Sequence, residues 1–594
     1  MLKDLRKAIA ATAVVCGFVL QISCQAQSTA ADSAAQRTLA AEAHTTEVKT
    51  TSAMDSSSAD ASQPAVSQPA ASQAATPVAV PVTPPKPRPG FFTRWGKAYL
   101  ADWTGTTPVD PNASQRRGTP APIPSPPFPA SDWPIGGTQE IGAPDYSSYQ
   151  LQTALDGDPL KLSKVKWYGW IAIGANGSTN NRGNAGKGIG ANSPSAYDVF
   201  PNTVVLDQLA LYTEKLADTV QKDHFDWGFR IASLYGQDYR YTTSHGILSQ
   251  QLLVKNAQYG YDPVMWYADL YFPKIAQGAD LRIGRYISLP DIEAQLAPNN
   301  YTYSHSILYT YDCYTMVGAN MTVKVDDHWT VQGGISPGCD TAPWTTDARV
   351  TGNVCLVYTW RNGGDALNTC DNTINNGKYA YNNLTAFYET WYHKINEHWH
   401  TDTEGWYQYM KDTPNMWWYN TGVPYNAVTS PWPENTGNNR LLPNGSMPGT
   451  LNFGAVCENP NTSYTGARAA RCYTPEWAIT NYVEHNFWNN TASLNMRSEI
   501  VDDIRGQRTG TPAIYEEHMV GFDFWAGTSV TFRPELSYTH AFSPYGLRAL
   551  DISPGASVSA LQNAPPNQLS EATMKAIGAK TQSLTLAADL IWHF

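Results

Sequence analysis

An apolar side chain occupies every second position near the C-terminus, from Leu584 to Phe594. This period of two predicts a β-strand with one apolar face. Lipid requires every backbone hydrogen-bonding group to be paired within the protein, so strands of about ten residues with an apolar outer face are typical of transmembrane β-barrels. Leu590, Trp592 and Phe594 would then form a C-terminal signal for barrel assembly.

Alternating segments of this kind follow one another from Lys164 onward, among them one expected strand over residues 306–325. The tight links between them lie near residues 217–223, 275–279, 325–328, 395–398, 487–491 and 525–528. The long links, rich in Asn, Gly and Pro, span residues 176–202, 243–261, 289–305, 339–379, 411–475 and 542–581. Short periplasmic turns and longer extracellular loops are typical of outer-membrane barrels. We therefore predict an all-β fold, a transmembrane antiparallel up-and-down β-barrel of about 14 strands, within a range of roughly 12 to 16.

The chain before the barrel divides into three parts. Residues 1–26 place basic residues before an apolar run, which is typical of a cleavable secretory signal, while Cys24 leaves lipoprotein processing as a less well supported alternative. Residues 27–90 form an Ala/Ser/Pro-rich linker, which we expect to be a disordered periplasmic extension because it has few large apolar residues. Residues 91–163 form a short periplasmic segment that begins with an expected amphipathic helix over residues 91–103, and residues 164–594 form the barrel.

Charged residues collect on one face of the expected strands. In one strand Phe229 and Ile231 alternate with Arg230, and in another Phe532 alternates with Arg533. An Arg or Lys on the lipid face near the membrane centre costs roughly 2 to 4 kcal/mol, so these charges are expected to face the lumen. The candidate pore-lining residues are Asp226, Arg230, Asp269, Arg282, Lys324, Arg497, Glu499, Arg533 and Glu535.

Charges of both signs in the lumen have two interpretations. Opposed basic and acidic side chains create a transverse field that selects permeants by charge and size, as in a diffusion pore. The same residues could instead form salt bridges that stiffen a plugged barrel, because a barrel of about 14 strands lies between filled eight-stranded barrels and open sixteen-stranded porins.

The composition fits a barrel and excludes a basic nucleic-acid-binding protein. The mean hydropathy is only −0.39, as expected when the two faces of alternating strands average out. Aromatic residues reach 12%, whereas charged residues make up 15%. Interfacial girdles of Trp and Tyr raise the aromatic content of membrane barrels. The formal net charge of −11 provides no basic patch for nucleic acid.

Six cysteines follow the signal sequence, an even number that suits an oxidising compartment. Cys313 and Cys339 are expected to pair across the hairpin that turns near residues 325–328, because they lie at nearly equal distances from that turn. The remaining cysteines are expected to pair within long loops, Cys355 with Cys370 and Cys457 with Cys472, although fifteen connectivities are possible for six cysteines. There is no CxxC pair and no zinc-type His/Cys cluster, so neither a metal nor a cofactor is predicted.

No GxSxG, HExxH, P-loop or dinucleotide-binding motif occurs in the chain, so we predict that it is not an enzyme. The densest polar cluster contains His398, His400, Asp402 and Glu404, which share one face of a regular strand. A metal or acid/base site there is a weaker interpretation than the exposed polar surface of a short turn. Aromatic residues of the 411–475 link could stack on sugars, although loop packing and an interfacial girdle explain them better.

Five segments carry a family resemblance: YGWIAIGANGSTNN (168–181), LDQLALYTEKLAD (206–218), WGFRIASLYGQDYRYT (227–242), ADLYFPKIAQGADLRIGRYISL (268–289) and YSHSILYTYDCYTMVGANMTVKVDDHWTVQGGISPG (303–338). They resemble the β-barrel porins of the OmpL-like group, most strongly over residues 168–338 and loosely to the C-terminus. The resemblance implies an outer-membrane barrel that forms a passive pore for small solutes, and it supplies no catalytic residues.

We therefore predict a porin of the outer membrane of a Gram-negative bacterium, which allows passive diffusion of small hydrophilic solutes or ions through a charged lumen. The alternative is a non-conducting outer-membrane barrel whose disulfide-tied extracellular loops bind a ligand or partner. The expected partners are outer-membrane lipid and lipopolysaccharide, the barrel-assembly machinery during insertion, and small hydrophilic solutes, but not nucleic acid. A homotrimer is compatible with this fold class.

Overall fold

The computed structural model describes most of the chain from residue 88 to residue 594. The residues outside the description are 1–87, 109–110, 112–113, 118–139, 146–148, 159, 161–162, 181–188, 191, 193, 254–257, 346–347, 375–383, 415–470, 490, 507–508, 510–512, 544–545, 548–549 and 552–579. The predicted signal sequence and almost all of the predicted linker therefore lie outside the described residues.

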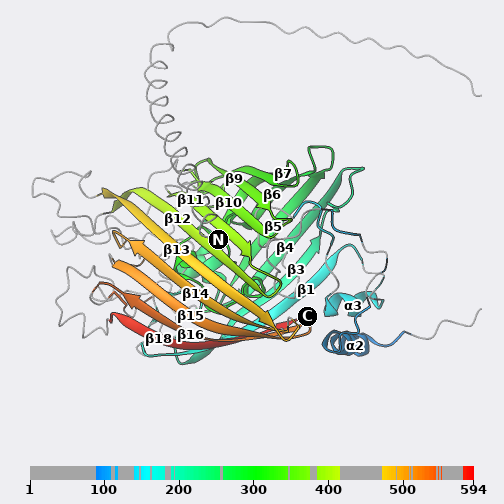
Figure 1. The fold of residues 1–594 in the computed structure, drawn as a ribbon, viewed down its shortest axis with the longest axis horizontal. Helices are drawn as coiled ribbons and strands as arrows, with labels where there is room; N and C mark the ends of the chain where they lie inside the picture. Colours follow the sequence, from blue (N-terminus) through cyan, green and yellow to red (C-terminus); the bar gives the residue numbers. More distant parts are fainter. Residues whose placement is uncertain are drawn as a thin grey trace, which may run out of the picture. The chain divides into compact units, whose positions relative to one another are not determined.

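A single antiparallel sheet closes on itself to form the barrel (Figure 1). Its strands are β1 (Lys166–Ser178), β3 (Thr203–Lys215), β4 (Asp226–Gly236), β5 (Gly260–Phe272), β6 (Ala279–Ile287), β7 (Thr315–Lys324), β8 (Trp329–Ser336), β9 (Thr351–Trp360), β10 (Asp365–Thr373), β11 (Leu384–Lys394), β12 (Trp399–Pro414), β13 (Arg471–Phe487), β14 (Ala492–Asp503), β15 (Ala513–Ala526), β16 (Val530–Ala541) and β18 (Gln582–His593). Each strand pairs with the next one along the chain, and β18 pairs with β1 to close the barrel. The predicted all-β up-and-down barrel is confirmed.

The barrel has 16 strands, so the expected number of about 14 was too low. The missing pair is β9 and β10, which lie within residues 339–379, the segment that we expected to be one long loop. β10 carries polar residues on both faces, including Asn368 inward and Asp371 outward, and therefore lacks the apolar alternation that marks the other strands. The turn between them is tight and contains Arg361, Asn362 and Gly363 at positive φ.

Short helices flank the barrel or lie in its loops. They are α2 (Phe91–Trp103), α3 (Gln150–Asp156), α4 (Tyr239–Thr242) and α5 (Ile307–Thr310), together with the 3-10 turns η2 (Ser249–Leu253) and η3 (Ala297–Asn299); β2 (Ile189–Gly190) and β17 (Leu550–Asp551) form a separate small sheet. Within the described part of the chain, none of the helices has the length and apolar character needed to cross a membrane. α2 has the predicted bounds and packs near the C-terminus, where the Tyr99 hydroxyl donates to the His593 carbonyl at 2.8 Å.

The link between β6 and β7, residues 288–314, folds into the barrel, and we call it the lumen loop. It extends beyond the expected loop of residues 289–305, because residues 306–314 form α5 and a turn where a strand was expected. The Ser306 side chain caps α5 by accepting a hydrogen bond from the Tyr309 amide at 3.0 Å. Every residue of the lumen loop is buried except Asn299, which is half-buried.

Candidate functional site

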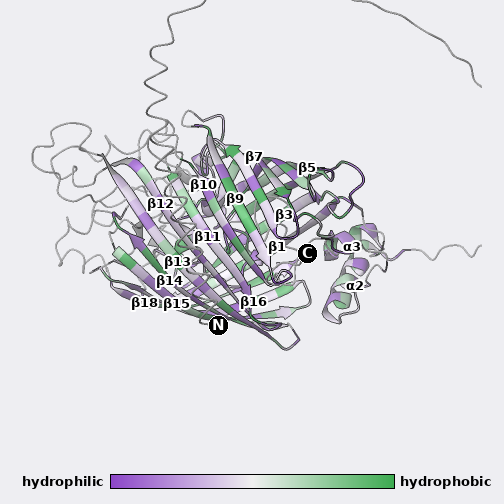
Figure 2. Ribbon diagram, turned by 45° about the horizontal axis from the view of Figure 1, so that its top comes forward, coloured by the Kyte–Doolittle hydropathy of each residue, from purple (hydrophilic) through white to green (hydrophobic). Residues whose placement is uncertain are grey.

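Hydrophilic and hydrophobic residues alternate along many of the strands (Figure 2), and this alternation separates an outer face from the lumen. On β14, Asn495, Arg497 and Glu499 point inward and are buried, whereas Met496 and Ile500 lie on the outer face. The lumen is therefore the place where charged side chains gather, and it is the candidate functional site.

The predicted pore-lining residues lie on the inward face of their strands. Seven of them are 4% exposed or less, namely Arg230, Asp269, Arg282, Arg497, Glu499, Arg533 and Glu535. The other two lie at strand ends next to tight turns. Lys324 is the last residue of β7 and is 8% exposed. Asp226 is the first residue of β4, where its carboxylate accepts hydrogen bonds from Lys215 Nζ at 3.2 Å and the Asp218 amide at 2.9 Å.

Three of these arginines pair with carboxylates that lie directly opposite on the neighbouring strand. Arg282 and Asp269 form a bidentate pair with distances of 2.8 and 2.9 Å. Arg533 pairs with Asp589 at 2.9 and 2.5 Å, and Arg230 donates twice to Glu214 at 2.8 and 2.5 Å. Buried charges of this kind require a partner, and the cross-strand register supplies one.

Sequence reasoning missed most of the carboxylate partners. Glu214, Glu517 and Asp589 are all buried and all pair with predicted arginines. Arg285 and its partner Asp262, which are 2.8 Å apart, were also missed. The signal that could have found Glu214, Glu517 and Asp589 is the register itself, since each lies on the inward side of its strand's alternation. Arg285 falls outside this signal, because it is only three residues from the inward-facing Arg282 and lies opposite Val317.

The remaining predicted residues hold the lumen loop. The Glu535 carboxylate accepts hydrogen bonds from the amides of Tyr303 and Ser304, at 3.1 and 3.0 Å. The Glu499 carboxylate accepts from the amides of Ile307 and Leu308, at 2.8 and 3.0 Å. Each carboxylate therefore satisfies two consecutive backbone donors of the loop, which otherwise would be buried without partners.

Two arginines bind the carbonyl groups of the same loop. Arg497 donates to the Ser304 carbonyl at 2.9 Å and to Glu517 at 2.5 Å. Arg533 donates to the carbonyls of Ala297 and Asn300, at 2.9 and 2.8 Å. Charged groups from β14 and β16 thus fix both the donors and the acceptors of the loop backbone.

Other strands contact the lumen loop from the remaining sides. On β11, Thr390 donates to the Pro290 carbonyl at 2.8 Å. On β12, Gln408 donates to the Tyr311 carbonyl at 3.0 Å. On β3, Gln208 donates to the Gln295 carbonyl at 2.8 Å. Hydrogen bonds from strands on several sides therefore hold the loop as a fixed part of the barrel interior.

The imidazole of His305 lies inside this packed loop. Burial lowers the pKa of His305 to about 3, so the ring is neutral at ordinary pH. Its Nε2 lies 2.8 Å from the Ala294 carbonyl, a contact in which the nitrogen must carry the proton. The loop therefore contributes no cationic histidine to the lumen.

An acidic wall faces the lumen loop on β12 and β13. His400, Asp402 and Glu404 share the inward face of β12, as the sequence suggested, but they are buried, whereas His398 is exposed in the adjacent turn. The expectation of an exposed polar turn therefore fails for all of them except His398. His400 contacts Glu484 of β13.

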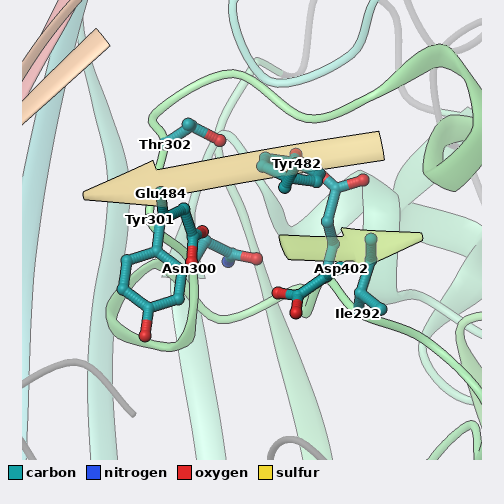
Figure 3. A pocket seen from close by; sticks show the side chains of 8 residues that line it. Ile292, Asn300, Tyr301, Thr302, Asp402, Tyr482 and Glu484 are labelled. Atoms are coloured by element: carbon teal, nitrogen blue, oxygen red, sulfur yellow. Dashed lines mark hydrogen bonds between the residues drawn. The ribbon is translucent and has the colours of Figure 1, made fainter. Parts of the chain in front are cut away.

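A small pocket opens between the acidic wall and the lumen loop. Figure 3 shows Asp402, Glu484 and Tyr482 from the strands together with Tyr301 and Asn300 from the loop around this pocket. Glu293, also from the loop, completes an acidic lining.

Two disulfides join the described cysteines. Cys313 and Cys339 are bonded, with their Cα atoms 5.5 Å apart, and they link the end of the lumen loop to the loop that follows β8. Cys355 and Cys370 are bonded as well. They lie opposite each other on β9 and β10, not inside a loop as expected, because that segment is a strand hairpin.

Some predictions fall outside the described residues. The expected pair of Cys457 and Cys472 cannot be placed, because residue 457 and the side chain of residue 472 are outside the description. The aromatic residues of the 415–470 segment are likewise outside it.

Among the described residues, two groups of lumen side chains could hold a metal ion. Asp291, Asp312 and Glu404 place carboxylate oxygens within 4.8 Å of one another, and so do His400, Asp402 and Glu484 with their ligand atoms. Asp340, beside the Cys313–Cys339 disulfide, completes a third group, but disulfide sulfurs do not act as thiolate ligands.

The sequence model of the family described as "Putative beta-barrel porin-2, OmpL-like" matches residues 164–555. The chain belongs to this family. It is accordingly a multi-strand β-barrel of the bacterial outer membrane with the role of a porin, and family and fold favour a channel over an enzyme. In barrels of this kind the short turns face the periplasm and the long loops the cell exterior.

Solved structures of porins resemble the chain as well. The anion-selective porin from Comamonas acidovorans has a TM-score of 0.37 and 8% identity, with 72% of this chain and 99% of that one covered. OmpT of Vibrio cholerae has a TM-score of 0.38 and 9% identity, with 73% and 99% covered. The channel DcaP of Acinetobacter baumannii has a TM-score of 0.37 and 9% identity, with 72% and 97% covered. The comparison with curated proteins found no match.

Proposed function

We propose that this porin lets small hydrophilic solutes and ions diffuse passively across the outer membrane, with a preference for cations. The observation that carries the preference is the charge of the interior. Among the described residues, buried aspartates and glutamates outnumber buried lysines and arginines by more than two to one. Carboxylates in a narrow passage raise the local concentration of cations and exclude anions.

The acidic wall is the proposed route past the lumen loop. The arginines of β4, β6, β14 and β16 are each matched by a carboxylate, so their charges are largely cancelled. Asp402 and Glu484 have no arginine or lysine partner within the described structure, and both line the pocket. Permeating cations would therefore pass between β12, β13 and the lumen loop.

Single-channel recording in a planar bilayer tests this function. The reversal potential in a KCl gradient gives the cation-to-anion permeability ratio, which we expect to exceed one. A unit charge about 6 Å from an ion in water contributes roughly 0.7 kcal/mol, about threefold in local concentration. Asp402→Asn and Glu484→Gln should therefore each lower the ratio about twofold or more. Glu516→Gln, which removes a carboxylate from the outer face of β15, is the matched control and should leave the ratio unchanged.

A second candidate function is a non-conducting barrel whose extracellular loops bind a ligand or partner. The observation that favours it is the lumen loop, which is almost entirely buried and fixed by several strands. A folded protein that never conducts would refute the diffusion-pore proposal and support the non-conducting barrel. An unchanged permeability ratio in the acidic-wall variants would refute only the proposed route and cation preference.

We also propose that the porin assembles as a homotrimer through the outer face of β12–β15. Thr403, Asn481, Ser498 and His518 face outward and oppose one another in a continuous row across these strands. Polar groups near mid-strand are disfavoured in lipid, so a second copy of the chain is the expected cover. The mass of the detergent-solubilised protein should be that of three chains, and Asn481→Leu with Ser498→Leu should yield monomers. A monomeric native protein would refute the proposal.

The other proposed partners follow from the membrane location. The apolar outer face would contact lipid and, in the outer leaflet, lipopolysaccharide. The barrel-assembly machinery would recognise Leu590, Trp592 and Phe594 at the end of β18. Of these, Leu590 and Trp592 are exposed on the outer face, 46% and 40% respectively.

A further inference from the structure

Three buried carboxylates meet where the lumen loop touches the barrel wall. Asp291 lies near the start of the loop, Asp312 lies near its end, and Glu404 projects inward from β12. Their oxygens lie within 4.8 Å of one another. The three residues are only 7%, 1% and 1% exposed, so bulk solvent screens their charges little.

Several carboxylate oxygens of this cluster accept no hydrogen bond from a donor group in the described part of the chain. No donor group of the described residues hydrogen-bonds either carboxylate oxygen of Asp291 or Oε1 of Glu404; the Asp312 carboxyl can share a hydrogen bond with Asp291 only if one of the two is protonated. The other Glu404 oxygen accepts from the Ile292 amide at 2.7 Å. Asp312 accepts from the Tyr388 hydroxyl and the Cys313 amide through one oxygen. The unpartnered oxygens of Asp291 point to a ligand that the protein itself does not supply.

No basic side chain compensates this charge. Within the described structure, neither Asp291 nor Glu404 pairs with a lysine or an arginine. The charged groups that act most strongly on Asp291 are acidic, namely Asp312, Glu404 and Glu293. By contrast, Glu517 has Arg497 at 2.5 Å. Like charges this close cannot all be ionised in a buried site unless a cation or a proton neutralises them.

We propose that Asp291, Asp312 and Glu404 bind a Ca²⁺ ion. Carboxylate oxygens are the ligands that this hard cation prefers, and it accepts six to eight of them in irregular geometry. Two charges on the ion offset most of the three on the ligands. Mg²⁺ is a poorer fit, because it demands near-ideal octahedral geometry and gives up its water reluctantly.

The neighbouring cluster is a weaker cation site. There, His400 already contacts Glu484, which engages one carboxylate, and a histidine nitrogen is not a preferred Ca²⁺ ligand. The two clusters lie on the same face of β12, at Asp402 and Glu404, so variants of these two residues can tell them apart.

A bound ion would cross-link the lumen loop. Asp291 and Asp312 come from its two ends, and Glu404 belongs to the wall, so one ion would tie both ends of the loop to β12. This inference does not depend on conduction, and it can hold or fail whether or not the barrel is an open pore.

The test is Ca²⁺ binding to the full-length protein, refolded under oxidising conditions in detergent free of lipopolysaccharide and stripped with EGTA. Titration calorimetry with CaCl₂ should give about one ion per chain. MgCl₂ should bind at least about tenfold more weakly. The temperature at which the folded band is lost on a heat-modifiability gel should rise with CaCl₂.

Variants decide the location of the ion. Asp291→Asn and Glu404→Gln should each weaken Ca²⁺ binding at least about tenfold, whereas Asp402→Asn, the matched control on the same face of β12, should bind as the native protein does. The heat-modifiable band shows that each variant has folded. Absence of Ca²⁺ binding by the folded native protein would overturn the proposal and leave protons to neutralise the cluster. Binding that survives in both Asp291→Asn and Glu404→Gln, or that is lost equally in Asp402→Asn, would overturn the assignment to these residues.

Discussion

The carboxylates of Glu499 and Glu535 should control how often the lumen loop leaves its place. Each accepts two consecutive backbone amide hydrogens of the loop, at distances between 2.8 and 3.1 Å. Replacing either residue by alanine leaves two buried amides without their acceptors. The strands should remain folded, because their own ladders are untouched, while the loop undocks more often.

The size of this effect follows from the two lost hydrogen bonds. A buried donor left without a partner costs about 1 to 3 kcal/mol. Water can reach an undocked loop in the lumen, so we take the lower end, about 2 kcal/mol for two amides. A difference of 1.4 kcal/mol is a factor of ten, so the population of the undocked loop should rise at least about twentyfold in Glu499→Ala or Glu535→Ala.

Cysteine labelling measures that population. Ala294 is 8% exposed in the lumen loop. A cysteine at this position adds only one sulfur atom to the alanine side chain, so the change in volume is small. In an Ala294→Cys background, the rate of modification by a charged maleimide should increase at least about twentyfold on adding Glu499→Ala or Glu535→Ala. Glu516→Gln, on the outer face, should leave the labelling rate unchanged. The glutamate variants without Ala294→Cys measure the labelling of native cysteines, which is subtracted. Equal labelling rates in all backgrounds would refute the anchoring role of both glutamates.

Two further predictions concern stability and assembly. Burial raises the pKa of Asp340, in the loop after β8, from 3.8 to about 7. The folded state therefore binds the Asp340 proton more tightly than the unfolded state does. The stabilisation that the bound proton provides is full below about pH 4 and is lost as the pH rises through 7. Asp340→Asn should flatten the dependence of the heat-modification temperature on pH between 4 and 8, and an unchanged slope would contradict this origin. At the C-terminus, the Phe594 amide donates to the Gly169 carbonyl at 2.9 Å. Deletion of Phe594 should therefore reduce the fraction of heat-modifiable protein in the outer membrane, whereas an unchanged fraction would show that this contact is dispensable.

Most of the barrel wall was predictable because most of its strands are locally amphipathic. The inward position of Arg230 and Arg533 follows from alternation alone, and the partnership of Cys313 with Cys339 follows from their similar distance to one turn. β9 and β10 were missed because a hairpin held by a cross-strand disulfide can carry polar residues on both faces.

The filling of the lumen could not be predicted in the same way. The lumen loop has no periodic pattern, since its backbone is satisfied by side chains far away in sequence, such as Glu499 and Arg533. The same distance explains why Asp291 and Glu404, separated by more than a hundred residues, gave no signal of a shared site. Local patterns predict elements, whereas these contacts depend on the closed barrel.

Closure by β1 and β18 has a consequence for the order of folding. Trp170, in the first strand of the barrel, pairs with His593, the last residue of β18, so the seam cannot form until β18 has been exported. Until then, both edge strands expose unpaired backbone groups that invite aggregation. Joining residues so distant in sequence is intrinsically slow. The yield of the mature barrel should therefore be limited by how well the two open edges are protected in the periplasm. The formation of any single hairpin should matter less.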